Sequence, residues 1–593
     1  MATRYAVANG NWSNTATWDG GTLPTSADDV HANNRTVTID QNVTVLSLRT
    51  TAGGAAVAGG VFNLNNGAAF NVTATNGFIA GSSTVLQVIG TGTRVITGSA
   101  TGSATTSNVN TIYVTHSSGN IPNTTLNGNL LGGSQSGAAA LYIWGGYVTI
   151  NGSVTGGTAG TNAAGISIFN SDNQPTQLTV NTGPVTGGSS SSGSTVGISV
   201  GYSPTGSALT NSSINLNCNL VGGSNSGSNA SVSSGQNIPI TVVGDIVGTV
   251  ANGLSISGSA ITTYNITGNI GAVGATNYCL ICQNGNAVFN ITGNVFGSNI
   301  SASGSAIRES PGTFVINGNV TAGRSGHGVD KNSSGNITIN GNVSGWPGTG
   351  GLTGSGNGVI VQSVATNTIT INGNAVGGMY PAVGSRAMNI QNAVVVTVNG
   401  SVIGGSGSGC PAIVMGGNNA SLTATRIVGS DGGFGATGVG STVFVNPGVD
   451  NIINNVNYAS PVYYKELQFG AFGACPIAGH ARLLDQTSNV FVGRTSTNTN
   501  KTLTDPNATG TYPTPDNVRS GISYASGNFT GTLAVPAASS VAAGVAVGNT
   551  VGTAVLTQAN VWDYALSSAS SVAGSVGEKL KKTAIPADII ALG

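Results

Sequence analysis

A short motif recurs through the middle of the chain and constrains the fold more than any other feature. Each copy has an apolar strand-like run, a polar residue, a glycine, a second polar residue and another apolar residue, as in Ile316-Asn317-Gly318-Asn319-Val320. Degenerate copies fall at 180–185, 216–220 and 242–246. Successive centres lie 23 to 35 residues apart, a period typical of solenoids, propellers and other arrays. The clear copies are centred on Gly128, Gly152, Gly268, Gly293, Gly318, Gly341, Gly373 and Gly400.

The residues around each glycine predict three short strands per repeat. Before the glycine, runs such as Ile337-Thr338-Ile339 alternate with period two, the pattern of a strand with one buried face. A second short strand follows the glycine, and a third apolar pair lies upstream, as in Ile166 and Ile168. Glycine permits a positive φ or a tight bend, and asparagine tolerates the same backbone region. We therefore predict an all-β fold, a right-handed parallel β-helix with coils stacked at about 4.8 Å.

Composition separates this fold from the alternatives. A propeller blade needs four longer strands over about 40 residues, and a calcium-binding roll needs repeated aspartates, which are nearly absent here. Only 6% of the residues are charged and the formal net charge is zero, so the basic patch that nucleic acid requires is missing. No stretch reaches the ~18 consecutive apolar residues that span a bilayer, so we expect no membrane insertion.

The pattern divides the chain into five predicted segments. Residues 1–30 are an N-terminal cap in which two tryptophans cover the apolar end of the solenoid, and residues 31–125 are irregular coils. The regular parallel β-helix covers 126–448, and a transition region covers 449–512. A mixed, partly helical assembly or attachment module covers 513–593 and begins at the boundary signal Pro513-Thr514-Pro515. The first residues contain no apolar stretch of signal-peptide length, so we expect synthesis in a host cytoplasm without a signal peptide.

The C-terminal segment contains the runs Asp516-Asn517-Val518-Arg519-Ser520-Gly521, Thr530-Gly531-Thr532-Leu533-Ala534-Val535-Pro536 and Val561-Trp562-Asp563. Together they resemble a C-terminal module of tailed-bacteriophage virion proteins, especially tail fibres and tailspikes. The resemblance covers about 80 residues. It implies a virion structural role and transfers no catalytic residue. The opening, with Trp12, Trp18 and a following Asp-Asp-Val, resembles the starts of β-helical surface proteins from bacteria and phages.

One charge cluster interrupts the neutral middle of the chain. Counting back from the repeat glycines stacks Arg308-Glu309 on Asp330-Lys331 in adjacent coils. Tailspikes often cleave polysaccharide with paired carboxylates, and Glu309 and Asp330 are the candidates for such a pair. Each acid, however, has a cation opposite it, Arg308 for Asp330 and Lys331 for Glu309, which keeps both acids ionised. We therefore predict an exposed ladder of ion pairs without catalytic activity.

Two other features suggest sites. The longest repeat spacing, between Gly183 and Cys218, predicts exposed insertions, where Tyr202 could stack on a sugar; the alternative is an ordinary solvent loop. Cys279 and Cys282 form a CxxC pair, but a zinc site needs two more ligands and the chain has no second pair of this kind. We predict that both cysteines are core residues, and that the protein holds no metal and no cofactor.

These observations predict a virion structural protein that is not an enzyme, a tail fibre or spike whose rigid rod attaches to the host surface. Two alternatives stay open: a tailspike depolymerase that cleaves host polysaccharide, and a bacterial β-helical adhesin. The predicted partners are two further copies of the chain in a homotrimer, other virion tail proteins, and a host cell-surface glycan or protein. Three copies acting together would raise avidity.

Overall fold

The computed structural model describes most of the chain from Ala2 to Tyr464 and isolated short elements beyond it. Within the first part it leaves out residues 66, 68, 159–163, 170–173, 190–194, 202–210, 225–231, 235–237, 250–251, 257–261, 273–277, 284, 299–303, 309–310, 349–355, 363–367, 379–384, 406–411, 416–420, 429–435, 439–441, 446–455 and 459–461. Beyond it, the described residues are 523–524, 529–530, 538–540, 546–547 and 550–551. The chain divides into two compact units, Met1–Thr504 and Asp505–Gly593.

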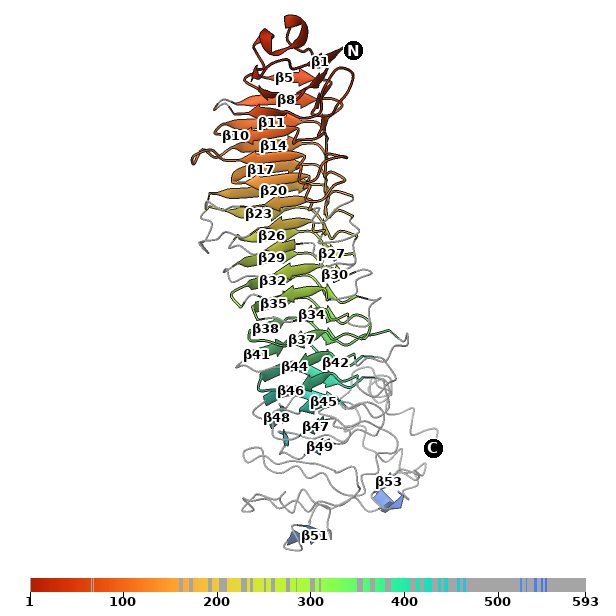
Figure 1. Ribbon diagram of the computed structural model, residues 1–593. Coiled ribbons are helices and arrows are strands. Elements are labelled where there is room, and N and C mark those ends of the chain that lie inside the picture. Colours follow the sequence, from red (N-terminus) through yellow and green to blue (C-terminus); the bar gives the residue numbers. More distant parts are fainter. Residues whose placement is uncertain are drawn as a thin grey trace, which may run out of the picture. The chain divides into compact units, whose positions relative to one another are not determined.

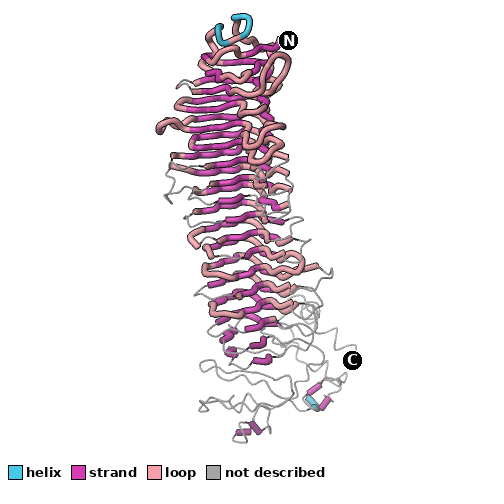
Figure 2. Tube along the Cα trace, in the orientation of Figure 1, coloured by secondary structure: helices cyan, strands magenta, loops and turns pink. Residues whose placement is uncertain are grey.

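The first unit is a stack of coils, each pairing in parallel with the coils before and after it (Figure 1). A typical coil contains β31 (Leu280–Cys282), β32 (Val288–Thr292) and β33 (Val295–Phe296), with the motif glycine Gly293 between the last two. Equivalent strands of successive coils form three rows, and strands alternate with loops around the stack (Figure 2). The predicted all-β stack of parallel coils is therefore confirmed.

The first row contains the strands that lie upstream of the motif, such as β31, and these form a sheet of their own. We call it the second sheet, and we call the sheet that contains the other two rows the main sheet. The strands of the second sheet are β2 (Gly10–Asn11), β4 (Thr36–Thr38), β7 (Val61–Leu64), β10 (Leu86–Ile89), β13 (Ile112–Thr115), β16 (Leu141–Trp144), β19 (Ile166–Ile168), β22 (Ile198–Val200), β25 (Val232–Ser234), β28 (Leu254–Ile256), β31, β34 (Ile307–Arg308), β37 (Val329–Lys331), β40 (Val359–Val361), β43 (Met388–Ile390), β45 (Ile413–Met415), β47 (Ala436–Gly438) and β49 (Val456–Tyr458).

The other two rows belong to the main sheet and are joined at the motif glycines. The row before the glycine contains β5 (Val43–Val45), β8 (Phe70–Ala74), β11 (Thr93–Thr97), β14 (Asn123–Asn127), β17 (Gly146–Asn151), β20 (Thr176–Thr182), β23 (Ser213–Leu216), β26 (Ile240–Val243), β29 (Thr263–Thr267), β32, β35 (Thr313–Asn317), β38 (Ile337–Ile339), β41 (Thr368–Ile371), β44 (Val395–Ile403), β46 (Ser421–Val428), β48 (Thr442–Val445) and β50 (Val462–Tyr464). The row after it contains β1 (Thr3–Tyr5), β3 (Asp29–His31), β6 (Ser47–Arg49), β9 (Phe78–Ile79), β12 (Ala100–Thr101), β15 (Leu130–Leu131), β18 (Val154–Thr155), β21 (Val185–Thr186), β24 (Leu220–Val221), β27 (Ile246–Gly248), β30 (Ile270–Ala272), β33, β36 (Val320–Thr321), β39 (Val343–Ser344) and β42 (Ala375–Val376). It continues into β44 and β46, which run through both rows.

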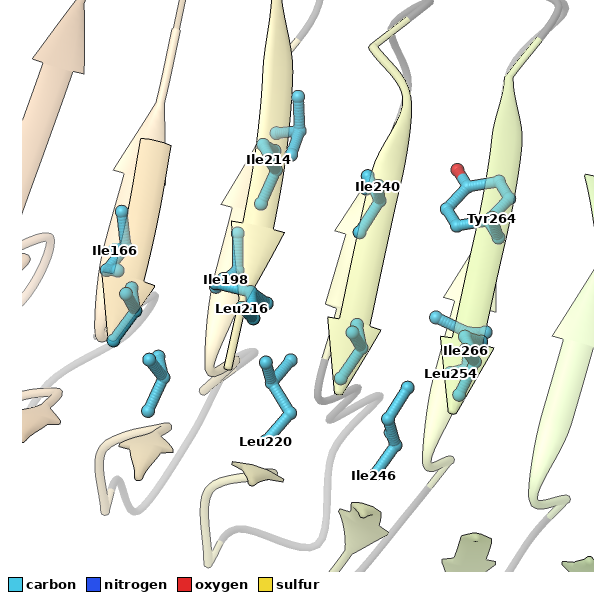
Figure 3. Close-up of a cluster of buried hydrophobic side chains, with 14 of the residues drawn as sticks. Ile166, Ile198, Ile214, Leu216, Leu220, Ile240, Ile246, Leu254, Tyr264 and Ile266 are labelled. Atoms are coloured by element: carbon cyan, nitrogen blue, oxygen red, sulfur yellow. The ribbon is translucent and has the colours of Figure 1, made fainter. Parts of the chain in front are cut away.

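The core lies inside the coils and is built from stacks of similar side chains. Because side chains alternate across a strand, every second residue of each strand points inward. Ile214, Ile240 and Tyr264 come from three successive coils in register, and Figure 3 shows them in line along the core. The stack continues into Phe289 and Phe314, whose rings lie nearly parallel at a centroid distance of 4.4 Å. Each coil thus buries its apolar face against its neighbours.

Asparagine ladders run along the outside on both sides of the motif glycine. Before the glycine, the Asn340 side-chain nitrogen donates to the Asn317 side-chain oxygen at 2.6 Å. After it, the Asn319 side-chain oxygen accepts the backbone N–H of Asn342 at 2.8 Å, which satisfies a backbone donor at the bend. The same geometry repeats from coil to coil and needs no charge, which explains why so neutral a chain stacks in register.

The structure explains why the motif requires glycine. A Cβ at each of the eight motif glycines would lie less than 3.0 Å from the carbonyl oxygen of the glycine in the preceding coil. A positive φ is recorded for Gly128, Gly268 and Gly293 among them. Close stacking of backbone on backbone, rather than an unusual φ, is therefore the reason shared by all eight positions.

The N-terminal end of the core contains two tryptophans that pack against each other. Trp12 and Trp18 are both buried, with ring centroids 4.6 Å apart in an edge-to-face arrangement. The indole N–H of Trp18 donates to the Trp12 carbonyl at 2.9 Å. Two short 3-10 turns, η1 (Thr15–Thr17) and η2 (Asp19–Gly21), accompany them.

The second unit contains two short antiparallel pairs among its described residues. These are β51 (Ser523–Tyr524) with β52 (Phe529–Thr530), and β53 (Ala546–Val547) with β54 (Thr550–Val551). A 3-10 turn, η4 (Ala538–Ser540), lies between them in sequence. Most of residues 513–593 lies outside the described residues, so the mixed, partly helical character of this segment and the five segment bounds stay predictions.

Candidate functional site

The charge cluster brings together residues from three adjacent coils. Arg308 and Asp330 are register partners in β34 and β37, and the Arg308 Nε lies 3.8 Å from the Asp330 Oδ2. The Arg308 Cζ also lies 4.1 Å from the ring centroid of Tyr278, a cation–π contact. Asn332 donates its side-chain N–H to Asp330 at 3.2 Å. The predicted Arg308–Asp330 pair is therefore confirmed.

The exposed ladder predicted for this cluster is wrong in its burial. Asp330 is 6% exposed and Lys331 is fully buried. Lys331 follows Val329 by two residues, so it shares the inward face of β37. Burial lowers the pKa of Lys331 to about 8, and the nearby Cys282 opposes this shift. Asp330 and Lys331 are thus largely removed from solvent, whereas the Arg308 side chain is still 30% exposed.

The described residues provide one carboxylate here and no acid–base pair. Between residues 251 and 464, Asp330 is the only carboxylate that the structure describes, and Glu309 lies outside the described residues. A cation beside a carboxylate stabilises its charged form, whereas a glycosidase acid must carry a proton. The geometry around Asp330 therefore favours a structural ion pair.

His327 lies three residues before Asp330 and carries a neutral, partly exposed imidazole. Its Nδ1 accepts the backbone N–H of Asn357 from the next coil at 3.2 Å, so a proton on that nitrogen would remove the hydrogen bond. Burial lowers the pKa of His327 to about 4.

We expect His327 to make the solenoid less stable as the pH falls from about 6.5 to about 4. In this window the unfolded chain binds the proton and the folded chain does not, so stability present above pH ~6.5 is lost. The loss amounts to at most about 3 kcal/mol. The check is the urea midpoint of wild type and His327→Asn at about pH 7.5 and about pH 4.5. An equal acid-induced loss in both proteins would refute this role of His327.

The other site candidates from the sequence are Tyr202 and the CxxC pair. Tyr202 and most of the insertion that follows it lie outside the described residues. Cys279 and Cys282 are both fully buried, and burial raises the pKa of the Cys279 thiol. Core packing of this CxxC pair is therefore confirmed.

The described part of the chain shows neither a metal-binding cluster nor a membrane-spanning helix. It contains no group of three or more histidine, cysteine, aspartate or glutamate side chains arranged to hold a metal ion. None of its helices has the length and apolar character needed to cross a membrane.

An aromatic cluster on the outer side of the second sheet is a site that sequence reasoning missed. Tyr113 and Tyr142 are register partners in β13 and β16, with ring centroids 5.3 Å apart. Trp144 ends β16 and meets Phe169, just after β19, edge to face with ring centroids 5.5 Å apart. We call these four residues the outer aromatic patch; all four are partly exposed.

The turns beside the patch are packed tightly against it. Gly145 has a φ of +79°, and a Cβ there would lie 2.9 Å from the His116 ring and 3.1 Å from the Gln174 Cβ. A Cβ on Gly201, in the coil after Phe169, would lie 2.7 Å from the Phe169 ring. The turn at Gly145, next to Trp144, and the backbone at Gly201, against Phe169, are therefore closely packed.

A sequence signal for the patch exists. The runs Ile112-Tyr113-Val114, Leu141-Tyr142-Ile143 and Ile166-Ser167-Ile168 alternate apolar and non-aliphatic residues, and the repeat phase stacks their outward positions. Reading the outward residues in register, rather than only the inward ones, predicts a patch at this point.

Comparisons with known proteins give no match: no family model, no curated protein and no solved structure is similar to this chain at a significant level.

Proposed function

We propose that this protein is a virion structural protein, a bacteriophage tail fibre or tailspike that attaches the particle to its host cell. The observation that carries the proposal is the unbroken stack of parallel coils from β1 to β50. A rigid β-helical solenoid of this kind suits a fibre, a spike or an adhesin, because each coil buries its core against the next and the stack extends in one direction. Within this proposal the coils wind to the right.

The choice of a virion protein rests on the C-terminal resemblance to phage tail proteins described above. A bacterial adhesin would use the same kind of solenoid. Labelling of intact particles separates the two alternatives, because an adhesin would be found on the bacterial surface. The chain acts without catalysis in this proposal, because the Arg308–Asp330 contact supports an ionised carboxylate.

The attachment role is tested by competition for the host surface. Purified full-length chain in excess is expected to bind host cells and to slow adsorption of the phage that encodes it, because both use the same receptor. Heat-unfolded chain serves as the control. A folded chain that leaves adsorption unchanged would contradict the proposal.

The depolymerase alternative has its own assay. Wild type, Glu309→Gln and Asp330→Asn are incubated with purified host polysaccharide, and newly released reducing ends are measured. We expect no release by any of the three. Release by wild type that either substitution abolishes would establish the enzyme instead.

We also propose that the fibre is a homotrimer whose C-terminal region joins it to its partner copies and to other virion tail proteins. Light scattering of the full chain is expected to give three times the monomer mass of 58.1 kDa. A chain ending at Asp450 is expected to be monomeric. A trimeric shortened chain would place the assembly contacts in the solenoid instead.

A further inference from the structure

The outer aromatic patch differs in kind from the rest of the described outer surface of the stack. Elsewhere the outward positions of the strands are mainly threonine, asparagine and serine. Here four aromatic side chains from three successive coils form two contacting pairs on the outer side of the second sheet. Contiguous exposed aromatic side chains rimmed by polar residues are typical of a binding site.

The chemistry around the patch indicates an uncharged partner. Between Arg94 and Arg308 the sequence contains no lysine or arginine, so these coils offer no such cation to neutralise phosphate, sulfate or carboxylate groups. The acids in that stretch are Asp172, which lies outside the described residues, and Asp245, which belongs to the asparagine ladder and accepts the backbone N–H of Asn269 at 2.7 Å. A ligand here is held by ring faces and hydroxyl groups.

The Tyr142 hydroxyl is a neutral group on the outward face of β16. Burial, and secondly the neighbouring Tyr113, raises the pKa of Tyr142 to about 12. The Tyr142 hydroxyl therefore keeps its proton at physiological pH and can act both as donor and as acceptor. Thr115 is the register partner of Trp144, and Ser167 is the register partner of Tyr142. Both add hydroxyl groups to the same outward face.

The size of the patch argues against a second copy of the chain as its occupant. An aromatic side chain buries roughly 150–250 Å² when fully covered. Because each of the four is only partly exposed, the patch offers at most about a few hundred Å². A stable interface needs roughly 800 Å² per partner. A small ligand with apolar faces and polar edges fits the area available.

We propose that the outer aromatic patch binds an uncharged glycan, with pyranose rings lying against the rings of Trp144, Phe169, Tyr113 and Tyr142. A pyranose has faces of C–H groups that pack on aromatic rings and a rim of hydroxyls that pair with tyrosine, threonine and serine hydroxyls. This inference rests on the proposed attachment function and names the receptor chemistry at one place on the rod.

The test measures binding of defined probes to the full-length chain. Calorimetry is run with neutral hexasaccharides of glucose, mannose and galactose, and with an acidic hexasaccharide of galacturonate. At least one neutral probe is expected to bind with little dependence on salt. Trp144→Ala is expected to weaken that binding about tenfold, and Trp144→Phe to weaken it less. Phe296→Ala removes a 40% exposed aromatic ring outside the patch and is expected to bind like wild type.

Several outcomes would overturn the inference. They are failure of all neutral probes to bind wild type, unchanged binding by Trp144→Ala, salt-sensitive preference for the acidic probe, or a change of mass in Trp144→Ala by light scattering. Trp144→Phe retains a ring and guards against loss of fold, which the urea midpoint monitors. Failure of this glycan-binding inference can be distinguished from failure of the proposed attachment function. If Trp144→Ala competes with phage adsorption as well as wild type does, the chain is still an attachment fibre and the patch is not its receptor site.

Discussion

Replacing Gly293 with alanine is expected to lower the free energy of unfolding by about 3–5 kcal/mol. A Cβ at this position would overlap the backbone carbonyl of Gly268 in the preceding coil, and the φ of +149° already favours glycine. Gly318 of the next coil stacks on Gly293 in the same way. The coils must separate to admit the methyl group, which stretches the parallel ladder on both sides.

Gly271→Ala is the matched control for this substitution. Gly271 lies in β30 of the neighbouring coil, and nothing lies within 4 Å of the position that a Cβ would occupy. Its effect is expected to stay within about 0.5 kcal/mol. The measurement is the urea unfolding curve of the two variants and wild type. Equal stability of Gly293→Ala and Gly271→Ala would show that the motif glycines do not stack as described.

Phe289→Ala is expected to lower the free energy of unfolding by about 3–5 kcal/mol. Phe289 is fully buried and is the middle of three parallel rings. Its ring centroid lies 4.7 Å from that of Tyr264 and 4.4 Å from that of Phe314. Removing it leaves a cavity inside the stack and breaks two ring contacts at once.

The same coil supplies the control, Phe296→Ala. Phe296 points outward from β33 and is 40% exposed, so its loss is expected to cost less than about 1 kcal/mol. Chemical denaturation gives both values, and hydrogen exchange locates the weakened coils. If the Phe289 and Phe296 variants lose the same stability, the inward and outward faces of this coil have been assigned the wrong way round.

The sequence predicts the solenoid well because its repeat carries two independent signals. Period-two runs such as Ile337-Thr338-Ile339 identify strands, and the spacing of the glycines identifies the coil. The observed strand β19 matches the apolar pair Ile166 and Ile168 expected upstream of the motif. The sequence predicts only part of the reason why the motif requires glycine. The stacking of one glycine on another is a contact between coils, and no residue pattern within a single repeat indicates it.

The candidate sites were harder to predict, because they depend on the face that a residue takes and on what covers it. The Arg308–Asp330 register followed from counting back from the glycines. Burial of Lys331 did not follow, because a lysine normally lies at the surface, whereas its period-two phase relative to Val329 places it on the inward face. The outer aromatic patch was missed for a related reason: attention to inward apolar residues overlooks the outward positions between them.

The central claim, that this chain is a virion attachment fibre, is tested most directly by locating it on particles. Antibodies raised against the purified chain, coupled to gold, are applied to intact phage released from cells that carry its gene, and the particles are imaged by negative-stain electron microscopy. We predict label at the tail, at the end that contacts the host. Particles without label, or label confined to the bacterial surface, would contradict the claim.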